Sequence, residues 1–230
     1  MTPALAVVAA ALLLTATILW SRYRRLARER FIRDYAFPRG LYERLRKRRP
    51  EMALRDCALV ARALRQFFLA YLRSGRQFVS MPSQLTDDLW HEFILYTKAY
   101  DEFCRQAFGS FLHHTPAVVL GADRQNNAGL RRAWWHACKE ENINPTKPSR
   151  LPLLFAIDTK FGIADGFRYT PDCRQLRDAG GTGGSVHCGG DFSDTSIDGG
   201  TDGLGDGSAT GGDGGDGGGD GGGGCGGGGD

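Results

Sequence analysis

The longest apolar run of the chain, Pro3–Trp20, contains no charged residue. With Met1 and Thr2 it is long enough to cross a hydrocarbon core of ~30 Å as a helix. A secretory signal peptide has positive charge before its apolar run, whereas here Ser21-Arg22-Tyr23-Arg24-Arg25 follows it. The pattern therefore predicts a retained transmembrane anchor over residues 1–21, with the N-terminus outside and the remaining chain cytoplasmic.

Helical periodicity dominates the region that follows. Apolar residues recur with a helical period over Glu51–Arg73, over a stretch from an N-capping Thr86 to about Ala107, and over Asn127–Glu140. The short apolar run Leu151–Asp158 fits either a strand or a buried helical turn, because periodicity does not separate the two. We therefore predict a mainly α protein with one small helical soluble domain, residues 51–173.

The segment between anchor and domain, residues 22–50, is basic and is interrupted by Pro38, Gly40 and Pro50. It can act as a topology signal on a solvated helix, and it can attract anionic lipid headgroups in the bilayer. Nucleic acid is a poor candidate partner, since no Gly/aromatic RNA-binding pattern accompanies the charges.

The C-terminal segment, residues 174–230, consists mostly of Gly, Asp, Ser and Thr, and the chain has 33 Gly in all. Such a composition cannot bury enough apolar area to offset the entropy of ordering, so we predict a disordered tail. Calcium-binding nonapeptide repeats also contain Gly-Gly-Asp runs, but they need a large apolar residue at fixed spacing, which this tail lacks.

Six cysteines are present, and none forms a Cys-x-x-Cys pair. Several lie in helical patterns beside apolar residues, where a free cysteine packs as a small hydrophobic residue. This usage is typical of a reducing compartment and agrees with a cytoplasmic domain.

The candidate chemistry lies in the predicted helix that starts at Thr86. Asp87 and His91 are four residues apart and face the same way on a helix. Gly109 lets the chain turn back, so His113 or His114 could approach the same helix face. Asp87, His91, His113 and His114 are therefore candidate ligands of one Zn or Fe ion.

The competing interpretation is structural. Asp87 and Asp88 suit the first turn of a helix, where negative charge complements the helix dipole, and His91 could pack beside Trp90. His91 has no second histidine at the spacing of the His-Glu-x-x-His zinc motif. A Gly-x-Ser-x-Gly nucleophile elbow is also absent from the sequence, and no phosphate-binding Gly loop precedes a helix.

The soluble part resembles the glycine-rich domain-containing protein-like family of plants and bacteria. The matching features are the Pro82-Ser83 turn, Trp90-His91, the stretch Thr97, Tyr100, Phe103 and Cys104, the close Gly109, Leu112, His113, His114 and Pro116, and the later segments 151–158 and 166–169. The likeness covers about Leu54–Cys173. Family members often carry a second histidine two positions after the Trp-His one, where this chain has Phe93. The resemblance implies a bacterial, inner-membrane, single-pass protein and no established activity.

Anchor, aromatic-rich helical domain and flexible tail together favour a membrane-tethered, cytoplasm-facing interaction or scaffold module with an unknown protein partner. The alternative is a metal-dependent enzyme or metal-binding protein with its site around His91 and His113/His114. The sequence specifies neither a reaction nor a substrate.

Overall fold

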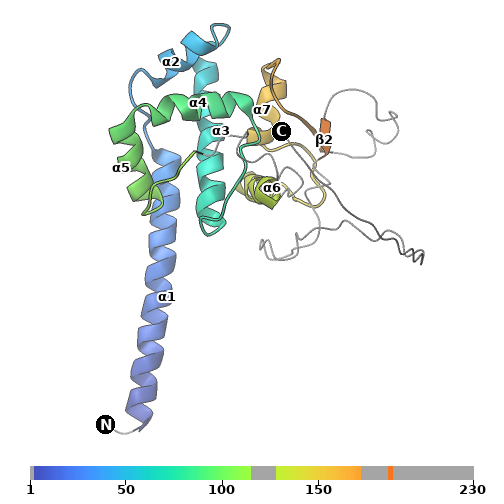
Figure 1. The fold of residues 1–230 in the computed structure, drawn as a ribbon. Coiled ribbons are helices and arrows are strands. Elements are labelled where there is room, and N and C mark those ends of the chain that lie inside the picture. Colours follow the sequence, from blue (N-terminus) through green and yellow to red (C-terminus); the bar gives the residue numbers. More distant parts are fainter. Residues whose placement is uncertain (1–2, 115–127, 172–185, 189–230) are drawn as a thin grey trace, which may run out of the picture.

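The computed structural model describes residues 3–114, 128–171 and 186–188, and this part of the chain is mainly helical (Figure 1). Its helices are α1 (Pro3–Asp34), α2 (Leu41–Arg48), α3 (Leu54–Arg73), α4 (Gln84–Ile94), α5 (Thr97–Ala107), α6 (Ala128–Glu140) and α7 (Leu153–Lys160). Two short strands, β1 (Arg168–Thr170) and β2 (Val186–Cys188), pair in parallel. The predicted fold class is confirmed.

Helix α1 projects from the rest of the molecule (Figure 1). The large apolar side chains of its first half are exposed, with Leu5, Leu12 and Leu19 each at least 60% accessible. A core helix of a soluble protein would bury such residues. The length and composition of α1 therefore fit either a single membrane-spanning anchor or a signal sequence.

The last turns of α1 belong to the folded unit. Ile32 of α1 and Leu41 and Leu45 of α2 are fully buried in the same core as α3. The carboxylate of Glu29 accepts hydrogen bonds from Arg73 of α3 at 2.7 Å and from Arg33 at 3.2 Å. The structure thus places the beginning of the folded unit earlier than the boundary at residue 51 predicted from the sequence.

Helix α3 is the centre of the core and packs on α1, α2, α4, α6 and α7. Phe67 and Phe68 lie on its buried face, where both rings contact Trp90 of α4. Phe68 also meets Phe103 of α5 at a ring-centroid distance of 4.8 Å. The predicted 51–73 helix is present, and it ends before Gly75, whose φ of 72° is the left-handed conformation that stops many helices.

The single helix predicted from Thr86 to Ala107 is wrong, because the chain breaks between α4 and α5 at Tyr96. Tyr96 leaves the helical region, with ψ at 58°, and its hydroxyl donates to the Arg39 carbonyl oxygen at 3.4 Å. The break lets α5 fold back, so that Phe93 and Phe103 pack against each other and against Tyr35 of the segment after α1. Tertiary packing therefore overrides the continuous helical periodicity.

Helix α4 begins earlier than predicted, and Thr86 is not its N-cap. The cap is Ser83, whose Oγ accepts from the Thr86 amide at 3.0 Å. The buried carboxylate of Asp158 accepts from the Gln84 and Leu85 amides at 2.8 and 3.1 Å. Asp158 lies on α7, so the apolar run left open between strand and helical turn is a helix.

The C-terminal predictions fall largely outside the described residues. Of the tail 174–230, only Val186–Cys188 is described, as β2 beside β1. The 127–140 helix is present as α6 and places Trp134 in the core beside Phe155 of α7. Cys57, Cys104 and Cys138 are buried free thiols.

Candidate metal centre

Three of the four predicted ligands come together on one side of α4. His114 Nε2 lies 2.9 Å from Asp87 Oδ1, and His91 Nδ1 lies 3.3 Å from Asp87 Oδ2. One ligand atom from each of the three residues falls within 4.8 Å of the others. The two imidazole rings are close neighbours, with centroids 4.2 Å apart.

The i, i+4 relation of Asp87 and His91 is the part of this geometry that α4 imposes directly. Asp87 lies in the first turn of the helix and His91 in its last turn. The Nδ1 atom of His91 is buried and has no hydrogen-bond partner among the described residues, although it lies 3.3 Å from Asp87 Oδ2. A buried ring nitrogen without a partner carries a desolvation cost, which a bound ion or an ordered water would remove.

His114 reaches the cluster because the chain after α5 is tied to α4. The Tyr100 hydroxyl donates to the Leu112 carbonyl oxygen at 2.6 Å and accepts from Trp90 Nε1 at 3.1 Å. Burial raises the pKa of Tyr100 well above its usual value, so its hydroxyl remains a donor. The His114 ring then packs edge-on against Trp90, with centroids 4.6 Å apart.

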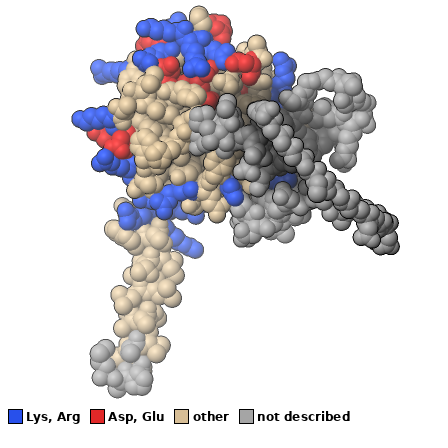
Figure 2. All heavy atoms as spheres, in the orientation of Figure 1, with Lys and Arg blue, Asp and Glu red and all other residues tan. Residues whose placement is uncertain are grey.

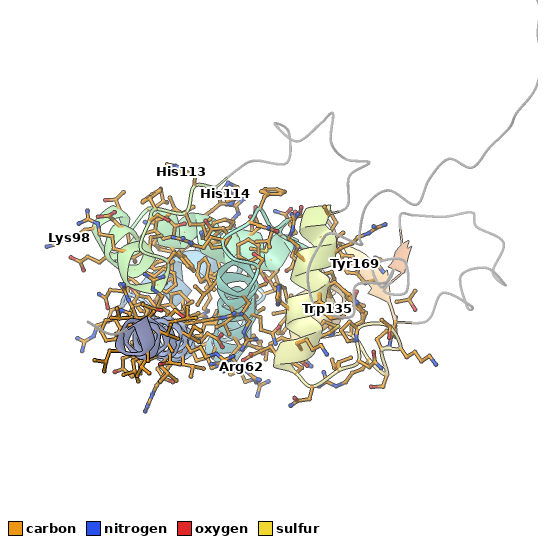
Figure 3. All side chains as sticks on the ribbon, turned by 90° about the horizontal axis from the view of Figure 1, so that it is seen from below. Arg62, Lys98, His113, His114, Trp135 and Tyr169 are labelled. Atoms are coloured by element: carbon orange, nitrogen blue, oxygen red, sulfur yellow. The ribbon has the colours of Figure 1, made fainter. Side chains whose placement is uncertain are left out.

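His113 is not part of the cluster. Its side chain is exposed and its ring contacts Phe111, with centroids 4.8 Å apart. Figure 3 shows it beside His114 at the edge of the domain. Adjacent residues of an extended segment point to opposite sides, so only one of the two histidines can face α4.

The other two acidic residues of α4, Asp88 and Glu92, pair with arginines instead of the histidines. Asp88 is fully buried and pairs with Arg48 and Arg49 at 3.0 and 2.8 Å. Glu92 accepts from Arg44 of α2 at 2.5 Å. Hydrogen bonds to Asp165 and then Asp88 raise the pKa of Arg49, which stays cationic. Asp87 is therefore the only carboxylate of α4 that faces the two histidines.

A pocket of about 190 Å³ opens beside the cluster. Asp87 and His114 form one wall together with Trp90, and the opposite side is mostly apolar. The other lining residues are Phe67, Tyr71, Phe78, Val79, Ser80, Met81, Ser83, Gln84, Leu112, His113 and Phe167. Two of the aromatic residues at this pocket, Phe78 and Phe167, are 46% and 40% exposed.

The sequence-based analysis did not find the groups that hold this site in place. Ser83 carried a usable signal, since a serine two residues before Leu85, the first apolar position of the helical pattern, is a candidate N-cap. Tyr100 and Asp158 carried none, because the atoms they bind lie outside their own helices, 12 residues away for Leu112 and 75 for Ser83.

No curated protein and no solved structure matches this chain. A family model described as UCP032817-like matches residues 27–192. The match begins within α1, beyond its exposed apolar half, and includes all three clustered residues. The chain belongs to the UCP032817-like family.

Proposed function

We propose that this protein is a membrane-anchored metal-binding protein whose ion is held by Asp87, His91 and His114. The observation that carries the proposal is the convergence of the three side chains, with ligand atoms within 4.8 Å of one another and one of them a buried, unpartnered imidazole nitrogen. The earlier candidate His113 is excluded from the ligand set because its ring lies on Phe111.

The donor set suits a first-row transition ion. Two imidazoles and one carboxylate bind Zn²⁺ and Fe²⁺ well, whereas Ca²⁺ and Mg²⁺ prefer oxygen ligands. With ligand bonds of about 2.0–2.2 Å in a tetrahedral site, neighbouring donor atoms lie about 3.3–3.6 Å apart. The contacts of 2.9 Å from His114 to Asp87 Oδ1 and of 3.3 Å from His91 to Asp87 Oδ2 are of the same order as this spacing.

Three protein ligands leave coordination positions open, which is the arrangement of a reactive rather than a purely structural site. The pocket borders Asp87 and His114, so a molecule bound there would reach the ion with its polar end and place an apolar part against Phe67 and Phe78. A pocket beside the ion supports a metal-dependent enzyme over a protein that only binds the metal. The geometry does not specify the reaction.

A second function, the interaction or scaffold module, is favoured by the exposed aromatics near the same pocket. Phe78, Phe111 and Phe167 are 46%, 41% and 40% exposed. Exposed aromatic side chains around an apolar hollow are typical anchors for a protein partner. In that case the Asp87–His114 contact is simply a hydrogen-bonded pair that fixes the pocket wall.

The topology in the proposal places the N-terminus outside and the domain in the cytoplasm of a bacterium, with one crossing of the inner membrane. The basic flank after Trp20 supports this orientation. Burial of the free thiols of Cys57, Cys104 and Cys138 is compatible with a reducing compartment. We also propose that residues 54–173 are related to glycine-rich domain-containing proteins. This relation implies no particular activity.

Thermal unfolding of the full-length protein in detergent tests the ion directly. Zn²⁺ or Fe²⁺ should raise the melting temperature, and a chelator should reverse the shift, since an ion that binds only the folded state stabilises it. His91→Gln and His114→Gln should abolish the shift. The neighbouring His113→Gln is the matched control and should keep it. A shift that persists in His91→Gln and His114→Gln would place the ion elsewhere, and no shift at all would favour the interaction module.

A further inference from the structure

A second hollow, of about 340 Å³ and lined by several arginines, lies where α1 enters the domain. Its walls come from two segments distant in sequence: the membrane-proximal turns of α1 and the end of α3. The residues that line it are Ser21, Arg24, Arg25, Arg28, Leu72, Arg73, Gly75 and Arg76. Figure 2 shows basic side chains gathered at this junction, without acidic ones among them on the face in view.

The arginines of this hollow fall into two groups. Arg25 and Arg73 are neutralised by Glu29, at 3.5 and 2.7 Å. Arg24, Arg28 and Arg76 have no ion pair with any described carboxylate. Burial and then the charges of Arg24 and Arg76 lower the pKa of Arg28, so Arg28 feels both neighbours as like charges. Bringing like charges together is unfavourable unless an anion shares them.

The backbone also holds Arg76 in an unfavourable conformation. Its φ is 65°, the left-handed region that non-glycine residues seldom adopt, and it follows Gly75 with a φ of 72°. Arg76 Nη1 donates to the Phe108 carbonyl oxygen at 3.1 Å. A methyl group at Gly109 would lie 2.8 Å from Arg28 Nη2, so Arg28 and Arg76 both sit at the C-terminal end of α5. The hydrogen bond to Phe108 holds Arg76 beside the hollow, and Arg28 lies next to it.

The depth of the hollow matches the headgroup layer of a bilayer. Trp20 ends the apolar run, and its ring stacks on Tyr23 with centroids 6.2 Å apart, as expected of aromatic residues at an interface. At a rise of 1.5 Å per residue, Arg24 lies about 6 Å and Arg28 about 12 Å beyond Trp20 along the helix. Headgroups occupy roughly 5–8 Å on each side of the hydrocarbon core, so the hollow begins at their level with Arg24 and extends a few ångströms beyond it to Arg28.

We propose that Arg24, Arg28 and Arg76 form a binding site for the phosphate of an anionic phospholipid headgroup at the junction of α1 and α3. Guanidinium groups bind phosphate oxygens through charge-assisted, frequently bidentate hydrogen bonds. The inference rests on α1 crossing a membrane and is independent of the metal centre. It differs from a general attraction of the basic segment to lipid because Arg76, more than 50 positions after Trp20, is part of the site.

The test uses the full-length protein in nanodiscs of phosphatidylcholine with and without phosphatidylglycerol, probed with spin-labelled forms of each lipid. We expect the labelled phosphatidylglycerol to be immobilised preferentially. Arg24→Gln and Arg76→Asn should each reduce that preference by about tenfold, the lower end of what one hydrogen bond to a charged group contributes, whereas loss of a basic residue near the surface alone costs about fivefold. Asparagine suits position 76 because it tolerates the left-handed backbone. Arg22→Gln is the matched control: it removes a charge of the same helix that does not line the hollow.

An equal loss in Arg22→Gln, or an unchanged preference in Arg24→Gln and Arg76→Asn, would overturn the site in favour of unspecific attraction. Inorganic phosphate at the same charge concentration should not displace the lipid; displacement would assign the hollow to a free anion instead. Melting curves in detergent identify variants that fail to fold. Arg24 is exposed, so Arg24→Gln leaves the Arg76–Phe108 hydrogen bond intact and tests the site without disturbing that contact. Failure of the protein to enter either nanodisc would refute the anchor and, with it, the headgroup site.

Discussion

Replacing Asp158 by alanine should destabilise the domain more than its position on the short α7 would suggest. The carboxylate is only 2% exposed and accepts four hydrogen bonds from the start of α4 and from the loop after α7. The donors are Ser83 Oγ at 2.7 Å and the amides of Gln84 at 2.8 Å, Leu85 at 3.1 Å and Phe167 at 2.9 Å. Alanine leaves all four donors without this acceptor.

The size of the effect follows from these contacts. A hydrogen bond to a charged group contributes about 1.5–3 kcal/mol, and four bonds to one carboxylate are not additive. Loss of the helix cap alone costs about 0.5–2 kcal/mol. We therefore expect Asp158→Ala to lower the free energy of unfolding by about 3–5 kcal/mol, out of about 5–15 kcal/mol for a typical domain. For a chain of this size that lowers the melting temperature by roughly 6–20 °C.

The assay is chemical and thermal unfolding of the full-length protein in detergent, followed by circular dichroism. Asp158→Asn keeps the shape but turns an amide N–H₂ toward donors, so it should also destabilise. Glu102→Ala removes an exposed carboxylate of α5 and should change the free energy of unfolding by less than about 0.5 kcal/mol. If Asp158→Ala costs less than about 1 kcal/mol, the start of α4 is not held by this carboxylate, and the account of how Asp87 is positioned fails.

Three further predictions concern other parts of the molecule. Burial, and then the charges of Arg73 and Arg25, lower the pKa of His136 to about 4. The unfolded chain, with a usual pKa of about 6.5, binds the proton first, so the free energy of unfolding should fall as pH drops from about 6.5 to about 4, and less so in His136→Gln. Tyr100→Phe removes the Leu112 hydrogen bond, and metal affinity should weaken by more than in the exposed control Tyr23→Phe, with the fold retained on circular dichroism. A reporter fused after Arg30 should be active in the cytoplasm; a reporter active only outside it would reverse the proposed topology.

The features that were predicted correctly depend on local spacing. The stripe of α3 and the i, i+4 relation of Asp87 and His91 need only the 3.6-residue period of a helix. The helix break at Tyr96 has no glycine or proline to mark it and arises from aromatic packing between α4, α5 and the segment after α1.

Residue spacing also could not predict which of His113 and His114 joins the cluster. It depends on which side of the chain faces α4 after the Tyr100–Leu112 hydrogen bond is made, and a shift of one residue would exchange the two. The Asp158 contacts to the start of α4 join residues 73–75 positions apart, a separation over which no helical or strand period operates. Such partners are decided by the packing of α7 on α4, which the sequence pattern of neither helix encodes alone.

The central claim is that Asp87, His91 and His114 share one metal ion, and Co²⁺ substitution tests it most directly. Titration of the full-length protein with Co²⁺ should give visible absorption bands that saturate at one ion per chain and report nitrogen and oxygen ligands. The account predicts that the bands are lost in Asp87→Asn, His91→Gln and His114→Gln and are unchanged in His113→Gln. Absence of a saturable spectrum in the wild-type protein, or an unchanged spectrum in the three ligand variants, would contradict it.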